Sequence, residues 1–156
     1  MIIHLISLLE QLEGKRNYAY RDEAGYLTIG IGHLLNQDEI FSGKIYIYDE
    51  LVKYTNGLTN DHCYRLLQQD IHKYKNVVEV MARVDLNLNQ ITALVSFCFN
   101  VGMQAFIKST LLKLLNDGNY DAVPEQLKRW RWAGGRVSKI LENRRKKEIE
   151  VWGTPV

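Results

Sequence analysis

The stretch from Leu12 to Leu35 reads LEGKRNYAYRDEAGYLTIGIGHLL, and it marks a change from a helical pattern to an extended one. Ahead of it, apolar residues recur at steps of three and four, which predicts an amphipathic helix. They are Ile2, Leu5, Ile6, Leu9 and Leu12. Gly14 directly follows Glu13, and glycine is the residue that helix C-termini prefer. The helix is therefore expected to end at Glu13.

Within the quoted stretch the period changes to two. Tyr18 and Tyr20 alternate with small or polar residues, the letters DEAG supply turn chemistry, and the letters YLTIG alternate again. The pattern predicts a hairpin between Asn17 and Gly32 that belongs to a small sheet.

The rest of the chain is mostly helical in pattern. A long stripe begins at Thr59 and runs to Met81, with Asp61 in its first turn, where the helix dipole favours acids. Segment 42–59 is ambiguous, because its letters IYIY favour a strand while its apolar spacing also fits a helix. The later helices are expected at Asn89–Val101, Phe106–Leu115, Asp121–Trp132 and Ser138–Val151.

This order of elements predicts an α+β fold in a single domain over residues 1–156. A β-containing lobe at 13–58 is joined by the long helix to a helical lobe, which comprises residues 59–156 and the helix at 1–12. Two lobes and a linking helix leave a cleft, and polymeric substrates lie in clefts. The acids of the hairpin are expected to line it.

Composition fits a compact domain: the chain has 156 residues, 46% of them hydrophobic, and a net charge of +2. The positive charge is concentrated between Lys128 and Lys147, where nine Lys or Arg residues stand against one Glu. This run is a solvated face, a nucleic-acid patch or a surface attracted to another anionic partner. Trp130 and Trp132 alternate with arginines, which suits core packing of the indoles better than stacking on bases.

Cys63 and Cys98 lie far apart in helical stretches, so we expect no disulfide. Neither cysteine has metal-ligand spacing, and we expect no metal and no cofactor. No stretch has the roughly 18–20 apolar residues of a membrane helix, and the N-terminal run lacks a cleavage site. We therefore expect a protein that folds in the cytoplasm and does not insert stably into a membrane.

Glu13, Asp22 and Thr28 together suit the hydrolysis of a glycosidic bond, which needs one proton donor and one carboxylate. Glu13 at a helix C-terminus beside apolar residues is expected to stay protonated longer than a free glutamate. Asp22 begins a polar turn, where water and amides stabilise its charge. Thr28 can hold a water, and Gly30 and Gly32 allow a backbone or a sugar ring to approach closely.

The run LEG…Y…D…G…TIGIGH resembles the phage-type lysozymes, glycoside hydrolase family twenty-four, in which a glutamate, an acid or cysteine, and a threonine stand at these intervals. The resemblance continues through LTNDHCYRLLQQD, NVGMQAFIKSTLLKLLNDGNYD and RWRWAGGRVSKILENRRKKE, and only segment 36–56 departs from it. It implies a lysozyme-like fold and cleavage of the β-1,4 bond between N-acetylmuramic acid and N-acetylglucosamine in peptidoglycan, with inversion. By this resemblance Glu13 is the acid, Asp22 the carboxylate that activates water, and Thr28 the holder of that water. Inversion requires the two carboxyl groups to lie roughly 6.5–9.5 Å apart.

The resemblance also implies six supporting residues. His33 would pair with Asp70, which would raise the pKa of the histidine, and Arg144 would point inward and approach the catalytic glutamate. Positions that line the saccharide cleft in the family correspond to Leu34 through its backbone, Phe99 through its apolar face and Ser109 through its hydroxyl. For Phe99 a place in the core is the stronger interpretation.

The expected protein is a monomeric phage endolysin that binds peptidoglycan and no nucleic acid. It would wait in the host cytoplasm until a holin-type pore releases it to the wall, although use within the phage particle stays open. Two alternatives remain. A lytic transglycosylase uses one glutamate and forms an anhydro sugar, and a non-catalytic wall-binding or nucleic-acid-binding module would use the basic end as its surface.

Overall fold

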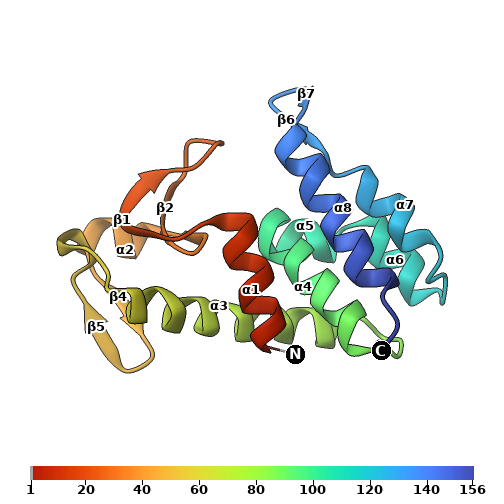
Figure 1. Ribbon diagram of the computed structural model, residues 1–156, viewed down its shortest axis with the longest axis horizontal. Helices are drawn as coiled ribbons and strands as arrows, with labels where there is room; N and C mark the ends of the chain where they lie inside the picture. The colour runs from red at the N-terminus through yellow and green to blue at the C-terminus, as the bar shows by residue number, and fades with distance from the viewer. Residues whose placement is uncertain (1) are drawn as a thin grey trace. The chain divides into compact units, whose positions relative to one another are not determined.

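The computed structural model describes residues 2–156 of the chain (Figure 1). Met1, which the predicted domain 1–156 and the predicted helix 1–12 both include, lies outside the described residues, as does the side chain of Ile2. Helices combine with small antiparallel sheets, which confirms the predicted α+β class.

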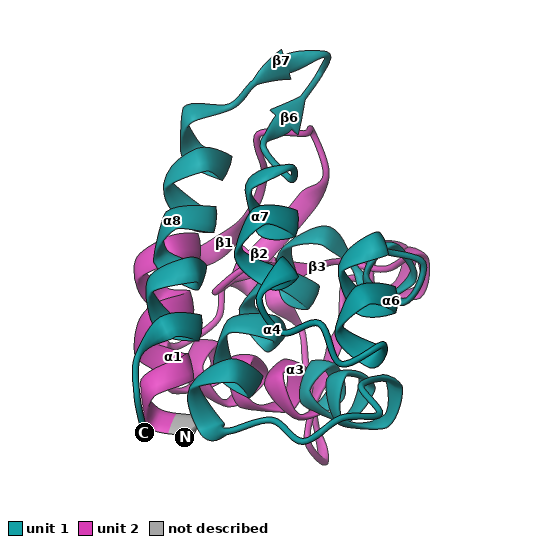
Figure 2. Cartoon of the chain, turned by 90° about the vertical axis from the view of Figure 1, so that its right-hand side faces the viewer, with its two compact units in different colours: residues 1, 73–156 teal, residues 2–72 magenta. Residues whose placement is uncertain are grey.

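The chain divides into two compact units, which Figure 2 colours separately: residues 2–72, here the strand unit, and residues 73–156, here the helical unit. The N-terminal helix falls in the strand unit by its contacts. The single domain with lobes at 13–58 and at 59–156 plus 1–12 stays a prediction.

The strand unit begins with the predicted amphipathic helix, α1 (Ile2–Glu13). Leu5 and Leu9 of its apolar stripe are fully buried. Gly14 adopts the left-handed conformation, with φ of 74°, and its N–H donates to the carbonyl of Glu10 at 2.9 Å. The glycine thus ends the helix as the sequence predicts.

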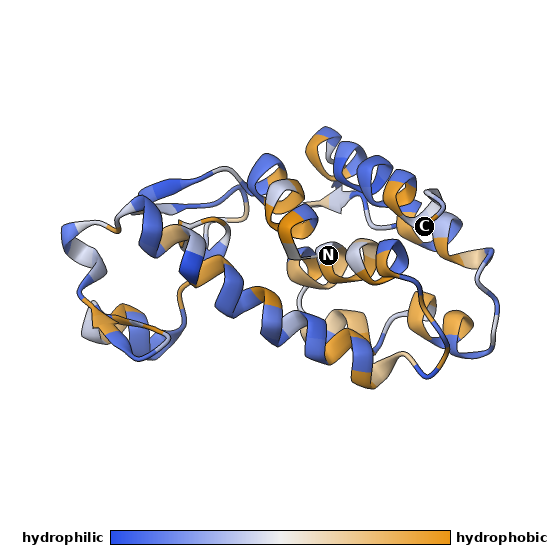
Figure 3. Cartoon of the chain, turned by 60° about the horizontal axis from the view of Figure 1, so that its bottom comes forward, coloured by the Kyte–Doolittle hydropathy of each residue, from blue (hydrophilic) through white to orange (hydrophobic). Residues whose placement is uncertain are grey.

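The predicted hairpin is confirmed and carries a third strand. The antiparallel sheet has the order β1 (Arg16–Arg21), β2 (Leu27–Gly30) and β3 (His33–Leu34). Strand β1 is almost wholly hydrophilic in Figure 3, whereas Thr28, Ile29 and Gly30 of β2 are buried. The sheet therefore has its buried residues in its central strand.

Segment 36–56, whose type the sequence leaves open, is a short helix followed by a second hairpin. Its elements are α2 (Gln37–Ser42), β4 (Ile45–Ile47), β5 (Glu50–Val52) and the 3-10 helix η1 (Tyr54–Asn56). Ile45 and Ile47 are buried while Tyr46 between them is exposed. This alternation is the period of a strand, so the strand alternative is right for the IYIY letters.

The predicted long helix is α3 (Asn60–Met81), which begins in the strand unit and ends in the helical unit. Thr59 caps it, because its hydroxyl accepts a hydrogen bond from the N–H of His62 at 3.0 Å. Hydrophilic and hydrophobic bands alternate along this helix in Figure 3, as its sequence stripe predicts.

The helical unit contains α4 (Leu88–Val101), α5 (Met103–Ile107), α6 (Thr110–Asn116), α7 (Ala122–Lys128) and α8 (Lys139–Gly153). Helix α8 packs against α4 and α7, and α7 also packs against α6 (Figure 1). Helices α4 and α8 match the predicted segments within two residues at each end.

Two predicted helices in this unit are wrong in extent. The one at Phe106–Leu115 is broken, because Lys108 ends α5 and Ser109 begins α6 as its N-cap, accepting from the N–H of Leu112. The one at Asp121–Trp132 ends at Lys128. Its last residue, Trp132, instead begins a two-stranded hairpin, β6 (Trp132–Ala133) with β7 (Arg136–Val137).

Both cysteines are buried and free, as predicted. Burial raises the pKa of Cys98 to about 12, which fits a small buried side chain between two phenylalanines. None of the described helices has both the length and the apolar character that crossing a membrane requires. Across residues 2–156, no three His, Cys, Asp or Glu side chains gather in a way that could hold a metal ion.

Candidate active site

Glu13, the predicted proton donor, lies at the last position of α1 and packs against a glycine of the turn between β2 and β3. A Cβ atom on Gly32 would come within 2.8 Å of the Cγ, Cδ and Oε2 atoms of Glu13. Gly32 also has φ of 69°, a conformation that other residues rarely adopt. The sequence predicts that a backbone or a sugar ring approaches Gly32, whereas in the structure the side chain of Glu13 occupies this space.

Asp22 and Thr28 are joined through the backbone of one residue, Tyr26. The N–H of Tyr26 donates to Oδ1 of Asp22 at 2.8 Å, and the carbonyl of Tyr26 accepts from the Thr28 hydroxyl at 3.0 Å. The same carbonyl accepts from the N–H of Asp22 at 2.9 Å. The turn thus holds the carboxylate and the hydroxyl in fixed places, although the sequence analysis assigned no role to Tyr26.

Thr28 is only 4% exposed and has its proton committed to the carbonyl of Tyr26. A hydroxyl whose proton is already donated has lone pairs left to accept a hydrogen bond. Thr28 can therefore accept from a water, which is the property that its predicted role needs.

Tyr20 stands directly opposite Thr28 in the β1–β2 pair, so both side chains lie on the same face of the sheet. Burial raises the pKa of Tyr20, the charges of Glu13 and Asp22 raise it further, and the charge of Arg16 opposes them. Both predicted acids are therefore close enough to act on this phenol. In the sequence, Tyr20 is visible only as part of a strand pattern.

His33 forms the predicted pair with Asp70, with 2.7 Å between Nδ1 and Oδ2. Its Nε2 lies 3.0 Å from Oε1 of Glu39, a second partner that the sequence did not indicate. Burial alone would lower the pKa of His33, but the hydrogen bonds and charges of the two carboxylates outweigh it and raise the pKa to about 9. The predicted upward shift is confirmed, and His33 links β3 to both α2 and α3.

The three predicted cleft residues fall in different surroundings. Leu34 is exposed at the end of β3, where its backbone pairs opposite Thr28. Phe99 is buried in α4, and its ring lies 5.1 Å from that of Tyr74. Ser109 is buried, and its hydroxyl donates to the carbonyl of Phe106 while capping α6. Leu34 belongs to the strand unit with the three catalytic candidates, whereas Phe99 and Ser109 belong to the helical unit.

Arg144 is buried, as predicted, and its surroundings explain why. Its Nε lies 3.4 Å from Oε2 of Glu148, and its Nη2 donates to the carbonyl of Ser96 at 3.0 Å. Nε of Arg145 lies 2.7 Å from Oε1 of the same glutamate. The Ser96 hydroxyl donates to Oε2 of Glu148 at 2.6 Å. Two of the nine cations in the basic run are therefore internal and share a buried carboxylate.

The two tryptophans of the basic run have different environments. Trp130 packs edge-on against Phe97, with ring centroids 5.3 Å apart, whereas Trp132 is 58% exposed, with Arg131 over its ring. The predicted core packing is thus right for Trp130 and wrong for Trp132, because the helix ends before it and the hairpin carries it outward.

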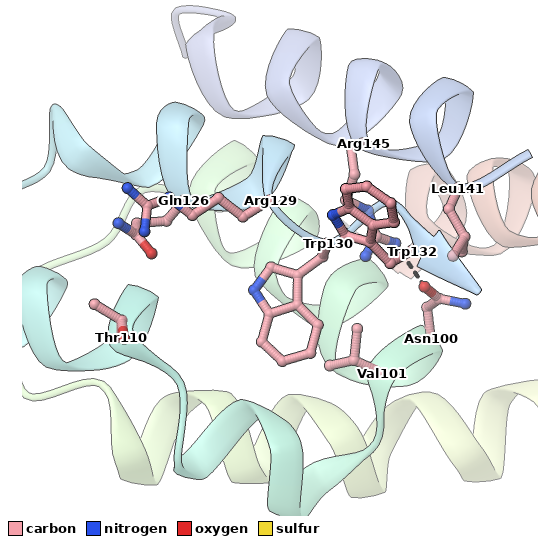
Figure 4. Close-up of a pocket in the computed structure, with 9 residues that line it drawn as sticks. All are labelled: Asn100, Val101, Thr110, Gln126, Arg129, Trp130, Trp132, Leu141 and Arg145. Atoms are coloured by element: carbon pink, nitrogen blue, oxygen red, sulfur yellow. Dashed lines mark hydrogen bonds between the residues drawn. The ribbon is translucent and has the colours of Figure 1, made fainter. Parts of the chain in front are cut away.

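Both indoles line a hollow of about 620 Å³ in the helical unit (Figure 4). Its polar groups include Gln126, Arg129 and Asn100, whose side chain accepts from Arg145 at 2.7 Å. Aromatic faces beside amides and a cation suit the binding of a polar organic group.

Comparison with known proteins identifies the chemistry that this arrangement serves. The family model described as phage lysozyme matches residues 10–148, which include the hairpin, the glycine-packed glutamate and the buried arginines. The chain belongs to the phage lysozyme family. It is accordingly a glycoside hydrolase of the lysozyme type, a peptidoglycan hydrolase of host-cell lysis.

Individual phage endolysins and solved lysozyme structures are similar to this chain in sequence and in fold. The SAR-endolysin of Escherichia phage Mu is 38% identical over 144 residues, covering 92% of this chain and 75% of the relative. Among solved structures, the muramidase domain of SpmX from Asticaccaulis excentricus has a TM-score of 0.77 at 29% identity, covering 97% of this chain and 96% of that one. A P22 lysozyme variant has a TM-score of 0.75 at 33% identity with the same coverage. The predicted lysozyme-like fold is confirmed.

Proposed function

We propose that this lysozyme cleaves the β-1,4 bond between N-acetylmuramic acid and N-acetylglucosamine with inversion, using Glu13, Asp22 and Thr28. The observation that carries the proposal is the double use of Tyr26, whose backbone positions the carboxylate of Asp22 and the hydroxyl of Thr28 at once. An inverting glycosidase needs a carboxylate and a positioned water on the face opposite the leaving group.

The attacking water would donate one proton to Thr28 and the other to Asp22. Thr28 can accept because its own proton goes to the carbonyl of Tyr26. A water with both protons engaged presents its lone pair to the anomeric carbon. As its oxygen forms the new bond to that carbon, its proton passes to Asp22.

Glu13 would protonate the leaving oxygen as the glycosidic bond breaks, so that the products are a new reducing end and a free hydroxyl. Its contact with Gly32 fixes the carboxyl group at the end of α1. By family resemblance, Arg144 would support the acid, and Leu34, Phe99 and Ser109 would contact the saccharide. His33 and Asp70 hold the sheet in place without contacting the substrate.

The enzyme would act as a monomer on peptidoglycan, without a metal, a cofactor or a nucleic acid. Seven cations of the basic run remain after the buried Arg144 and Arg145 are set aside, and they suit weak attraction to the anionic wall. Relatives are named endolysins and SAR-endolysins. We propose that the protein stays in the host cytoplasm until a holin-type pore admits it to the wall.

Substitution Glu13→Gln tests the proposal, because an amide cannot supply the proton. We expect lysis of purified walls, followed by turbidity, to fall by roughly 10²–10⁴-fold, with the circular dichroism spectrum unchanged. Asp22→Asn should lose activity in the same assay, and Asp38→Asn on the exposed face of α2 is the matched control. Full activity of folded Glu13→Gln would contradict the proposal and favour a binding module.

The products separate hydrolysis from the transglycosylase alternative. Mass spectrometry of digested walls should show reducing muramic ends that contain the oxygen of the solvent when the reaction is run in ¹⁸O-water. Anhydromuramic ends would favour the transglycosylase. Proton NMR of the first product should show the inverted anomer before it equilibrates.

A further inference from the structure

Strand β1 contains an irregularity beside the site that the three catalytic candidates do not explain. Arg16 pairs with Gly30 and Tyr20 pairs with Thr28, so the three residues 17–19 stand opposite the single residue Ile29. Bulges of this kind are frequent next to active sites, where they redirect a side chain.

The bulge brings Arg16 against Tyr20. In a regular strand, residues four apart are separated by roughly 13 Å, whereas partners two apart, such as Thr28 and Gly30, are separated by roughly 7 Å. The guanidinium of Arg16 consequently lies over the ring of Tyr20, 4.6 Å from its centroid. Such a stacked cation restricts the orientation of the ring.

The bulge is also held by contacts with Gly57 and Leu58. The side-chain amide of Asn17 donates to the carbonyl of Leu58 at 2.7 Å, and the N–H of Leu58 donates to the carbonyl of Asn17 at 2.7 Å. Tyr18 packs against Gly57, where a Cβ atom would meet its ring at 2.9 Å. These contacts hold the bulge in place, and the bulge in turn positions Tyr20.

The hydroxyl of this fixed ring is a donor without a partner. Among residues 2–156, no hydrogen bond involves the Tyr20 hydroxyl, although the side chain is only partly exposed and faces the same side of the sheet as Thr28. Since its proton is not committed within the described residues and it lies on the same face of the sheet as Thr28, this hydroxyl can donate a hydrogen bond to an oxygen of a bound substrate.

We propose that Tyr20 is a substrate-contacting residue of the site, its hydroxyl donating a hydrogen bond to an oxygen of the bound saccharide while Arg16 holds its ring. The acceptor is a hydroxyl or acetamido oxygen of the amino sugar. This inference rests on the proposed function of Glu13, Asp22 and Thr28.

Substitution Tyr20→Phe tests it, because only the hydroxyl is removed. Hydrolysis of soluble, uncrosslinked glycan fragments, followed by chromatography, should show KM raised by roughly threefold to tenfold, the cost of one neutral hydrogen bond, with kcat and its pH profile unchanged. Tyr46→Phe is the matched control, since Tyr46 is 64% exposed on β4 and takes no part in the bulge, and its KM should equal that of the unchanged enzyme.

Arg16→Met supplies a second, independent measurement. It removes the cation over the ring, so KM should rise by a smaller factor, and in the Tyr20→Phe background it should add nothing, because no hydroxyl remains to be held. An unchanged KM for Tyr20→Phe would overturn the inference. A loss confined to kcat with a shifted pH profile would also overturn it, because Tyr20 would then act on the acids.

The assay distinguishes this inference from the proposed function. If Glu13→Gln is inactive on the same fragments while Tyr20→Phe keeps the original KM, only the role of Tyr20 fails. If Glu13→Gln is fully active, the proposed function fails whatever Tyr20→Phe does.

Discussion

The molecule contains two groups of carboxylates with opposite surroundings. In the strand unit, Glu13 and Asp22 are partly exposed and lie beside glycine backbone and a polar turn. In the helical unit, Glu148 is fully buried between Arg144 and Arg145 and accepts from Ser96. The proposed mechanism assigns chemistry to the accessible carboxylates, whereas the buried carboxylate serves structure.

The difference follows from what burial does to a charge. Burial raises the pKa of Glu148, while the two arginines and the Ser96 hydrogen bond act against that shift. A buried charge is tolerated only when its partners are close, so the loss of one partner is costly. Glu13 and Asp22 are partly exposed to solvent, so their loss should affect the reaction more than the fold.

The largest expected effect on stability comes from Glu148→Gln. It leaves two buried guanidinium groups without their carboxylate, and we expect the free energy of unfolding to fall by about 3–5 kcal/mol. Urea denaturation followed by circular dichroism measures it. Glu150→Gln on the exposed side of the same helix is the control and should change little. A Glu148→Gln protein as stable as this control would remove the distinction between the two regions.

The second-largest expected effect is a pH dependence of the free energy of unfolding, which arises from His33 in the strand unit. Burial lowers the pKa of His33, but Asp70 and Glu39 outweigh it and raise the pKa from 6.5 to about 9. The stability that the protonated ring contributes to the folded protein is therefore complete below pH 6.5 and is lost as pH rises through 9. We expect about 3 kcal/mol of stability to disappear across that window.

Urea denaturation at pH 6 and pH 9 measures this loss, and His33→Gln should flatten the dependence. Titration of the His33 ring by NMR should give a midpoint near 9. A midpoint at the ordinary histidine value would show that the two carboxylates do not hold the proton.

Gly32→Ala should reduce activity by about 100-fold, because the new methyl group must displace the carboxyl of Glu13 and small misplacements of a reacting group are costly. Gly118→Ala in the helical unit is the control. Gly118 shares the left-handed conformation, with φ of 84°, but no neighbour would meet its Cβ within 4 Å. Turbidity assays of both variants separate the effect of displacing the Glu13 carboxyl from the effect of backbone strain at a left-handed glycine. Equal activities would show that Glu13 does not depend on Gly32.

The smallest effect compares matched helix caps. Asn36 and Asn87 cap α2 and α4 in the same way, each accepting from the N–H three residues on and paired with Glu39 or Gln90 in a capping box. Replacing either with alanine should cost about 1 kcal/mol. Hydrogen exchange should show faster exchange in segment 36–56 for Asn36→Ala and in the helical unit for Asn87→Ala. Faster exchange in both units from either variant would indicate that they unfold together.

Much of the strand unit could be predicted because its signals are local. The end of α1 depends on Gly14, and the hairpin depends on a turn of four residues. Each feature is therefore determined by residues that are close together in the sequence. The break at Lys108 could not be predicted, since the apolar spacing continues through it and Ser109 acts as a cap only once α5 has ended. The exposed position of Trp132 likewise depends on a hairpin that begins where a helical pattern was expected.

The sequence by itself determined the family, the first helix and hairpin, the long helix and the spacing of Glu13, Asp22 and Thr28, because periodicity, caps and turns act between near neighbours. Only the tertiary structure decided that Glu39 joins His33, that Arg16 lies over Tyr20, and that Glu148 is buried together with two arginines of an apparently exposed run. These contacts depend on which packed surfaces meet and on how a bulge shortens a strand, and no pattern along the chain encodes either.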